Sequence, residues 1–185
     1  MDRRLRQMEW IGIPVCFLLA VLMHNLYEWS GEAAWVGVWT PVNESVWEHG
    51  KLLGVPYLLW SAAEWMLFRP NVRRFITAKT AALYAMSAAM MGFFYLYTAV
   101  AGHAITVLDI VSTAVWIALG FWISQKGYAS ARTSEWFTTA VFALILYGVL
   151  YVGFTFNPPH WMPFRDPIDG TYGLQRIRVA STIPT

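Results

Sequence analysis

The chain has 185 residues, of which 57% are hydrophobic and 13% are charged. Soluble domains carry about 25% charged residues, so this chain has too few charges to cover the surface of such a domain. A mean hydropathy of +0.44 agrees with a protein whose main solvent is lipid. The net charge of +2 comes without a basic stripe, which argues against a nucleic-acid partner. The single cysteine, Cys16, excludes an internal disulfide and any Cys-x-x-Cys metal or redox pair.

Five stretches of the chain are long and apolar enough to cross a bilayer, which takes about 20 residues in a helix. They cover residues 10–28, 43–68, 79–102, 105–125 and 136–156. We therefore predict an all-α fold, a polytopic transmembrane helix bundle of about five spans over residues 1–156.

The C-terminal tail, residues 157–185, is rich in proline and contains the turn signal Asp169-Gly170. Each proline removes a backbone donor and restricts the residue before it, so the tail should not be helical. Because the tail also carries Trp161 and Phe164, we expect an ordered, irregular strap over the outer end of the bundle. A disordered tail is the alternative.

The basic residues predict how the bundle is oriented. Nine of the 13 lie before the first span, between the second and third, or between the fourth and fifth: Arg3, Arg4, Arg6, Arg69, Arg73, Arg74, Lys79, Lys126 and Arg132. The other four are Lys51, Arg165, Arg176 and Arg178. Basic residues concentrate on the cytoplasmic side of membrane proteins. We therefore expect a multi-pass protein of the bacterial cytoplasmic (inner) membrane, with a cytoplasmic N-terminus and an extracytoplasmic C-terminus.

Polar residues gather at the span ends that this orientation places outside. Thr40, as N-cap, and Pro41, in the first turn, predict the start of the second span. At 100° per residue, one stripe of this helix carries Glu44, Glu48 and Lys51. The adjacent stripe carries Ser45 and His49. The first span ends with His24 and Glu28, which are also spaced i, i+4.

If these polar residues serve a function, we expect them to bind a divalent metal such as zinc. Ionisable groups at a membrane edge are costly and point to function, and His, Glu and Asp are the ligands that such a metal needs. The candidate ligands are His24, His49, Glu28, His103 and Asp109. The candidate catalytic residues are Glu48 and Glu44, as general bases, and Ser45. The remaining polar candidates are Asn43, Lys51, His160 and Asp166.

Two other interpretations of the same residues stay open. They could form a structural network of buried ion pairs and hydrogen bonds between the first, second and fourth spans, or lie exposed at the level of the lipid headgroups. At the cytoplasmic end, Glu64 is expected to extend toward Arg69 in a structural role.

Two segments carry a family resemblance. TPVNESVWEHGKLL and PPHWMPFRDPIDGTYG resemble the PVNES-WEH-K helix start and the F-DP-G-YG tail of an uncharacterised bacterial family of small multi-spanning membrane proteins. This resemblance implies a membrane protein whose outer polar residues matter, and it brings no established activity.

A weaker resemblance is to the membrane hydrolases that include alkaline ceramidases and progestin/adiponectin receptors. Ser45 and His49 match the Ser-x3-His of that group, and Asp109 could stand for its aspartate. This resemblance implies a zinc site. The late His-x3-His pair of the group is missing here, and five expected spans replace seven.

Three classes of function remain. A metal-dependent hydrolase or transferase acting on a lipid or lipid-linked substrate is favoured by the polar residues and the strap. A small-molecule transporter would place its site near the midplane and show repeats, which this sequence lacks. The third class is a structural or signalling subunit whose polar residues form a structural network. Membrane lipids are expected partners, and a homo-oligomer or a partner subunit stays open.

Overall fold

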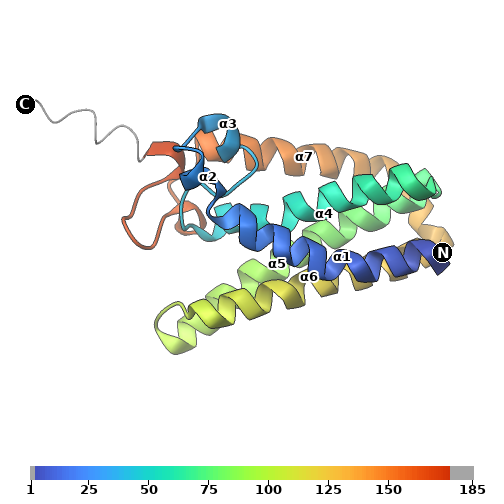
Figure 1. The fold of residues 1–185 in the computed structure, drawn as a ribbon, viewed down its shortest axis with the longest axis horizontal. Helices are drawn as coiled ribbons and strands as arrows, with labels where there is room; N and C mark the ends of the chain where they lie inside the picture. The colour runs from blue at the N-terminus through green and yellow to red at the C-terminus, as the bar shows by residue number, and fades with distance from the viewer. Residues whose placement is uncertain (1–2, 176–185) are drawn as a thin grey trace, which may run out of the picture.

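The computed structural model describes residues 3–175, and five long helices form one bundle in it (Figure 1). These helices are α1 (Arg3–His24), α4 (Val46–Phe68), α5 (Val72–Ala101), α6 (Thr106–Ala129) and α7 (Phe137–Phe156). The short elements are α2 (Leu26–Trp29), α3 (Ala34–Gly37) and the 3-10 turns η1 (Ala131–Trp136), η2 (Met162–Phe164) and η3 (Gly173–Gln175). Over the described part of the chain there is no strand, so the predicted all-α helical bundle is confirmed.

The helix ends follow local capping chemistry. Helix α4 starts after Ser45, whose hydroxyl accepts a hydrogen bond from the Glu48 N–H (3.3 Å). The predicted start at Thr40 and Pro41 is therefore wrong by five residues: the Thr40 hydroxyl donates instead to the carbonyl of Val36 (3.1 Å). Residues 41–45 form a bent segment ahead of the helix, and this segment carries Glu44 at the start of α4.

Four segments are long and apolar enough to cross a membrane, which indicates a membrane protein: Arg3–His24, Val72–Ala101, Thr106–Ala129 and Ala131–Phe156. Helix α4 is not among them, because Glu48, Lys51 and Glu64 lower its hydropathy. It is nevertheless the central helix, in contact with α1, α5, α6 and α7. Its charged side chains are buried against protein, and its crossing as a fifth span stays a prediction.

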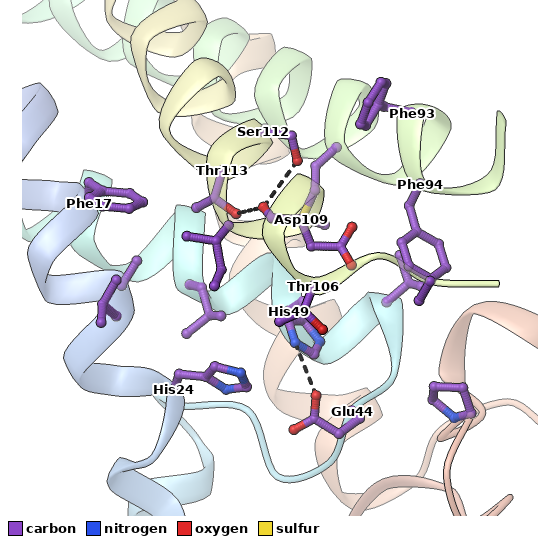
Figure 2. A pocket seen from close by; sticks show the side chains of 18 of the residues that line it. Phe17, His24, Glu44, His49, Phe93, Phe94, Thr106, Asp109, Ser112 and Thr113 are labelled. Carbon is purple, nitrogen blue, oxygen red and sulfur yellow. Dashed lines mark hydrogen bonds and ion pairs between the residues drawn. The ribbon is translucent and has the colours of Figure 1, made fainter. Parts of the chain in front are cut away.

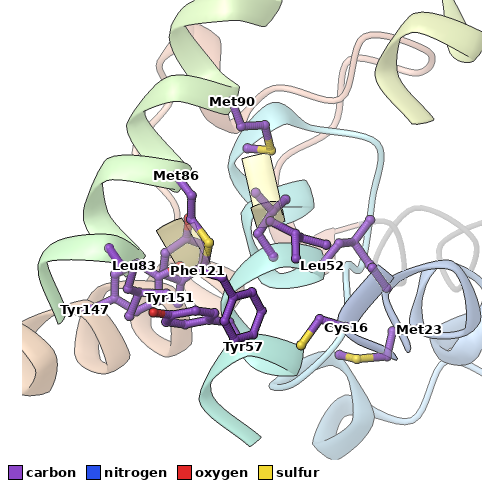
Figure 3. Close-up of a cluster of buried hydrophobic side chains, with 14 of the residues drawn as sticks. Cys16, Met23, Leu52, Tyr57, Leu83, Met86, Met90, Phe121, Tyr147 and Tyr151 are labelled. Carbon is purple, nitrogen blue, oxygen red and sulfur yellow. The ribbon is translucent and has the colours of Figure 1, made fainter. Parts of the chain in front are cut away.

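The core lies where α4 meets its four neighbours (Figure 3). Tyr57 of α4 packs edge-on against Phe121 of α6, with ring centroids 5.1 Å apart. On its other side, α4 presents Gly50 and Gly54, which face the side chains of Tyr151 and Tyr147 on α7. Small residues permit such close approach between helices in a membrane.

The two ends of the bundle differ in chemistry. One end, here called the strap end, gathers the ends of α1, α5 and α7, the starts of α4 and α6, and the strap (residues 157–175) (Figure 1). The opposite, basic end carries the N-terminus and the α4–α5 and α6–α7 connections. Lys79 was expected in the first of these loops, but α5 begins at Val72, so Lys79 lies inside the helix and is buried. Arg176 and Arg178 lie outside the described residues.

Candidate functional site

A cavity of about 430 Å³ opens at the strap end of the bundle. It is bounded by the end of α1, the starts of α4 and α6, the last turns of α5, and Pro167 and Ile168 of the strap. Apolar side chains such as Phe17, Phe93 and Phe94 form much of its wall (Figure 2). The polar residues that it contains are therefore confined to a few positions.

Three of these polar residues form a compact group at the cavity: His24 from α1, Glu44 from the turn before α4, and His49 from α4. One possible ligand atom from each lies within 4.8 Å of the other two. His49 Nε2 is 3.4 Å from Glu44 Oε2, and the two imidazole rings have centroids 5.3 Å apart (Figure 2). The side chains of His49 and Glu44 are 29% and 43% exposed, so solvent and ligands can reach them. Among residues 3–175, this is the group of His, Cys, Asp and Glu close enough to hold a metal ion.

Backbone contacts fix the orientation of this group. His49 Nδ1 lies 2.9 Å from the carbonyl oxygen of Ser45, which accepts a hydrogen bond from the tautomer that carries its proton on Nδ1. In that tautomer, the lone pair of Nε2 is free to bind a metal. Metal-binding histidines usually have such a partner on the other ring nitrogen, and it fixes their tautomer. The Glu44 N–H donates to Asp166 Oδ2 of the strap (3.0 Å). The strap therefore positions one of the three candidate ligands.

Asp109 contributes a second acidic position on the cavity wall, at the start of α6. The hydroxyl of Tyr97 donates to its Oδ1 (2.6 Å). The hydroxyls of Ser112 and Thr113 donate to its backbone carbonyl, at 3.1 and 2.8 Å (Figure 2). Asp109 is therefore held in place without belonging to the histidine group.

Glu48 and Lys51 form a different, buried network next to the cavity. Lys51 Nζ lies 2.6 Å from Glu48 Oε2 and donates to Thr155 Oγ1 of α7 (2.6 Å) and to the Gly37 carbonyl (2.7 Å). Glu48 Oε2 also accepts the Val42 N–H (3.1 Å). This network ties α4, α7 and the loop before α4 together. Glu48 was expected to act as a general base, whereas here its carboxylate is buried and turned away from the cavity.

The other predicted residues lie outside the histidine group. Glu28 is exposed on α2, and His103 is exposed in the α5–α6 turn. His160 stacks on Tyr172 within the strap, with centroids 4.5 Å apart. The hydroxyl of Ser45 caps α4, as described above.

Asn43 and Asp166 bind the strap to the start of α4. Asn43 Oδ1 accepts the Ser45 N–H (3.0 Å), and its Nδ2 donates to the Gly173 carbonyl (3.5 Å). Buried Asp166 accepts N–H bonds from Glu44 and, within the strap, from Ile168 (2.7 Å). The PVNES and F-DP-G-YG segments are thus in direct contact.

Sequence reasoning missed two parts of the polar structure. One is Tyr97, whose position in an apolar helix gave no sign of its bond to Asp109. The other is at the basic end, where Glu64 was expected to extend toward Arg69. Glu64 forms an ion pair with Lys79 instead (2.6 Å), while the Arg69 guanidinium lies 4.7 Å from the Trp65 ring centroid. An acid and a base on neighbouring apolar spans are the signal that could have revealed this pair.

Comparisons with known proteins agree with the expectation of an uncharacterised family. Neither the curated proteins nor the solved structures that were compared contain a match to this chain. A family of unknown function matches residues 2–174, which is nearly the whole chain. The chain therefore belongs to the family of unknown function DUF6512.

Proposed function

We propose that this membrane protein binds a divalent transition metal, zinc above all, through His24, Glu44 and His49, and uses it to hydrolyse a lipid or lipid-linked substrate. The observation that carries the proposal is the histidine group itself: three ligand atoms within 4.8 Å of one another, beside an apolar cavity.

The ligand set supports a catalytic metal more than a structural one. Structural zinc sites are closed by four protein ligands, whereas catalytic sites use three and keep a position for water. Two histidines and one glutamate are a known catalytic set in zinc hydrolases. Bound at these residues, zinc would supply Lewis-acid activation of a water and of a substrate carbonyl.

Asp109 is the group that we assign as general base. Glu48 is engaged with Lys51, and Glu44 would be a ligand, so neither carboxylate is free to accept a proton. Asp109 faces the same cavity, and the hydrogen bond from Tyr97 orients its carboxylate. A base must lie within reach of the water that it activates, either directly or through one further water.

The cavity lining supports a substrate with an apolar chain. Phe17, Phe93, Phe94 and Ile110 come from three helices, and Ile168 of the strap also lines the cavity. An acyl chain could fill this space while its ester or amide group lies at the histidines. The weaker resemblance to the ceramidase group, carried by Ser45, His49 and Asp109, is in line with this substrate class.

Metal content is the first test. The protein, purified in detergent and loaded with zinc, should retain about one equivalent, and His24→Ala and His49→Ala should each lose it. His103→Ala is the matched control, because His103 lies at the same end of the bundle but outside the group. Acidification should also release the metal, because a protonated imidazole cannot act as a ligand. Metal retained by the His24→Ala/His49→Ala double variant would overturn the proposal.

Hydrolysis is the second test. Vesicles of phospholipid, diacylglycerol and ceramide should release free fatty acid with the zinc-loaded protein. Asp109→Asn should retain zinc and lose this activity. Zinc binding without hydrolysis of any of the three would reject the enzyme and favour a non-enzymatic membrane protein, a transporter or a partner-dependent subunit. Absence of zinc would leave the polar residues as a structural network.

A further inference from the structure

A second group of charged residues lies at the basic end of the bundle, far along the helices from the histidines. Glu9 of α1, Glu64 of α4 and Lys79 of α5 are 1%, 0% and 4% exposed. They meet at one point, and we call them the Glu9–Glu64–Lys79 cluster. Nothing in the proposed metal chemistry uses them.

Both carboxyl groups form their ion pairs with the same ammonium group. Lys79 Nζ is 2.6 Å from Glu64 Oε2 and 2.9 Å from Glu9 Oε1. Ser124 of α6 also donates its hydroxyl to Glu9 Oε1 (2.8 Å). Aromatic rings enclose the ammonium, with the centroid of Phe121 4.9 Å from Nζ. Four helices therefore build this site.

The charges of the cluster do not balance. Two ionised carboxylates and one ammonium would leave a net negative charge in a place that water does not reach. An uncompensated buried charge costs several kcal/mol, and such a group neutralises instead. The other titratable neighbours, the Tyr57 hydroxyl and the Cys16 thiol, are acids that can supply no positive charge.

Three buried oxygen atoms show where the imbalance lies. Glu9 Oε2 and both carboxyl oxygens of Glu64 have no hydrogen bond of good geometry within the part of the chain that the structure describes, although Glu64 Oε2 lies against the ammonium. Buried polar atoms normally have a partner. Glu9 Oε1 accepts hydrogen bonds from both Lys79 and Ser124, whereas Glu64 accepts none of good geometry and has only the nearby ammonium and the Trp60 indole as donors. Glu64 is therefore the acid that should be neutral.

We propose that the Glu9–Glu64–Lys79 cluster is a binding site for one proton, which Glu64 holds at neutral pH beside an ionised Glu9–Lys79 pair. A proton fits better than a metal ion, because the ammonium of Lys79 already lies between the two carboxyl groups. The site is independent of the histidine group, since the two share no residue and lie at opposite ends of α4.

Infrared spectroscopy of the full chain in detergent at neutral pH tests this proposal. The wild type should show the carbonyl band of one protonated carboxyl group, and glutamate labelled with carboxyl-13C should shift that band. Glu64→Gln should abolish it. Glu9→Gln should abolish it too, because Glu64 then pairs with Lys79 alone and ionises. Lys79→Met should enlarge the band, because both acids then lack a counter-charge.

Glu48→Gln is the matched control: Glu48 is equally buried but balanced one to one by Lys51, so its loss should leave the band unchanged. A wild-type protein without the band overturns the proposal, as does a band that glutamate labelling does not shift. A labelled band that persists in folded Glu64→Gln overturns it as well. If Glu64→Gln does not fold, the labelled wild type decides by itself.

Discussion

Lys51 connects more of the molecule than any charged residue near the cavity. Its ammonium group has oxygen partners on α4 and α7, at the last residue of α3 (the Gly37 carbonyl, 2.7 Å) and in the loop that follows (the Thr40 carbonyl, 3.3 Å). An ammonium has three protons to donate, so these partners saturate it. Buried polar networks that are fully satisfied stabilise one arrangement of the surrounding helices. The start of α4 is thereby held for the histidine group beside it.

Removing one partner from this network should lower stability. Thr155→Val deletes the hydroxyl that accepts from Lys51 and donates to Glu48 (2.6 and 3.3 Å), with little change in volume. Losing a hydrogen bond to a charged group costs about 1.5–3 kcal/mol, so the free energy of unfolding in detergent should fall by about that amount. Thr98→Val is the control, because the Thr98 hydroxyl bonds only to carbonyls of its own helix. Equal losses in both variants would contradict this role.

Asp166 should control the metal without touching it. Asp166→Ala removes the acceptor that holds the backbone N–H of Glu44. Loss of an outer partner of this kind typically weakens metal binding by about 10–100-fold. Titration of the purified protein with zinc measures the effect. Asp169→Asn, an exposed change in the same strap, should bind zinc like the wild type; a similar loss there would mean that the strap acts only through its overall fold.

The sequence indicated the histidine group only in part, for reasons of local geometry. His24, Glu44 and His49 were all among the predicted site residues, because polar side chains at span ends stand out against an apolar sequence. The i, i+4 argument for Glu28 assumed one continuous helix, but α1 ends at His24. Glu48 follows Val46 and Trp47 on α4 and lies about 100° from His49, which turns it toward α7. Side-chain direction at this precision depends on packing between helices.

At the scale of secondary-structure elements, α4 and α7 pack closely because glycines of α4 lie against tyrosines of α7. A β-carbon at Gly50 would collide with the hydroxyl of Tyr151, whose ring stacks on Trp47 (centroids 4.6 Å apart) and cannot move away freely. Gly54 faces Tyr147 in the same way. The spacing of four residues on both helices makes the two contacts equivalent, one turn apart.

Gly50→Ala should therefore destabilise the bundle. Overpacking of a filled interface costs about 1–3 kcal/mol, which outweighs the gain of about 1 kcal/mol in helix propensity from glycine to alanine. Gly148→Ala on α7 is the matched control, because a β-carbon there meets nothing within 4 Å. Thermal unfolding in detergent should separate the two variants. A Gly50→Ala protein as stable as Gly148→Ala would show that α7 moves to accommodate the methyl group.

Helix positions were easier to predict than helix ends. The long helices follow the apolar stretches of the sequence closely, since hydropathy decides which segments leave water. Helix α5 begins at Val72 rather than at residue 79, because the Asn71 side chain caps it by accepting the Arg74 N–H (3.2 Å). Arg73, Arg74 and Lys79, which follow Val72, had suggested that this part of the chain is a loop. A helix can extend beyond its apolar stretch wherever a cap is present, and hydropathy does not record caps.

At the scale of the whole molecule, the orientation in the membrane is the main prediction. The basic end should face the cytoplasm and the strap end the outside, because basic residues stay on the cytoplasmic side. Reporter fusions at Thr185 should be active only in an extracytoplasmic format. Fusions in the α4–α5 connection, at Pro70, should be active only in a cytoplasmic format. The reverse pattern would place the histidine group, and any lipid substrate that it acts on, at the cytoplasmic side of the membrane.

The buried charges of α4 also constrain how the protein is made. Glu64 meets Lys79 only after α5 has been synthesised, and the Thr155 partner of Lys51 follows 104 residues later in the chain. Until then, Glu64 would have no counter-charge and Lys51 would have only Glu48 of its own helix, and such groups are costly in lipid. If α4 crosses the bilayer as predicted, Glu64 gains its counter-charge only when α5 packs against α4, and the Lys51 network is closed only when α7 joins it. We therefore expect α4 to be a poor span by itself and to depend on helices that follow it in the chain.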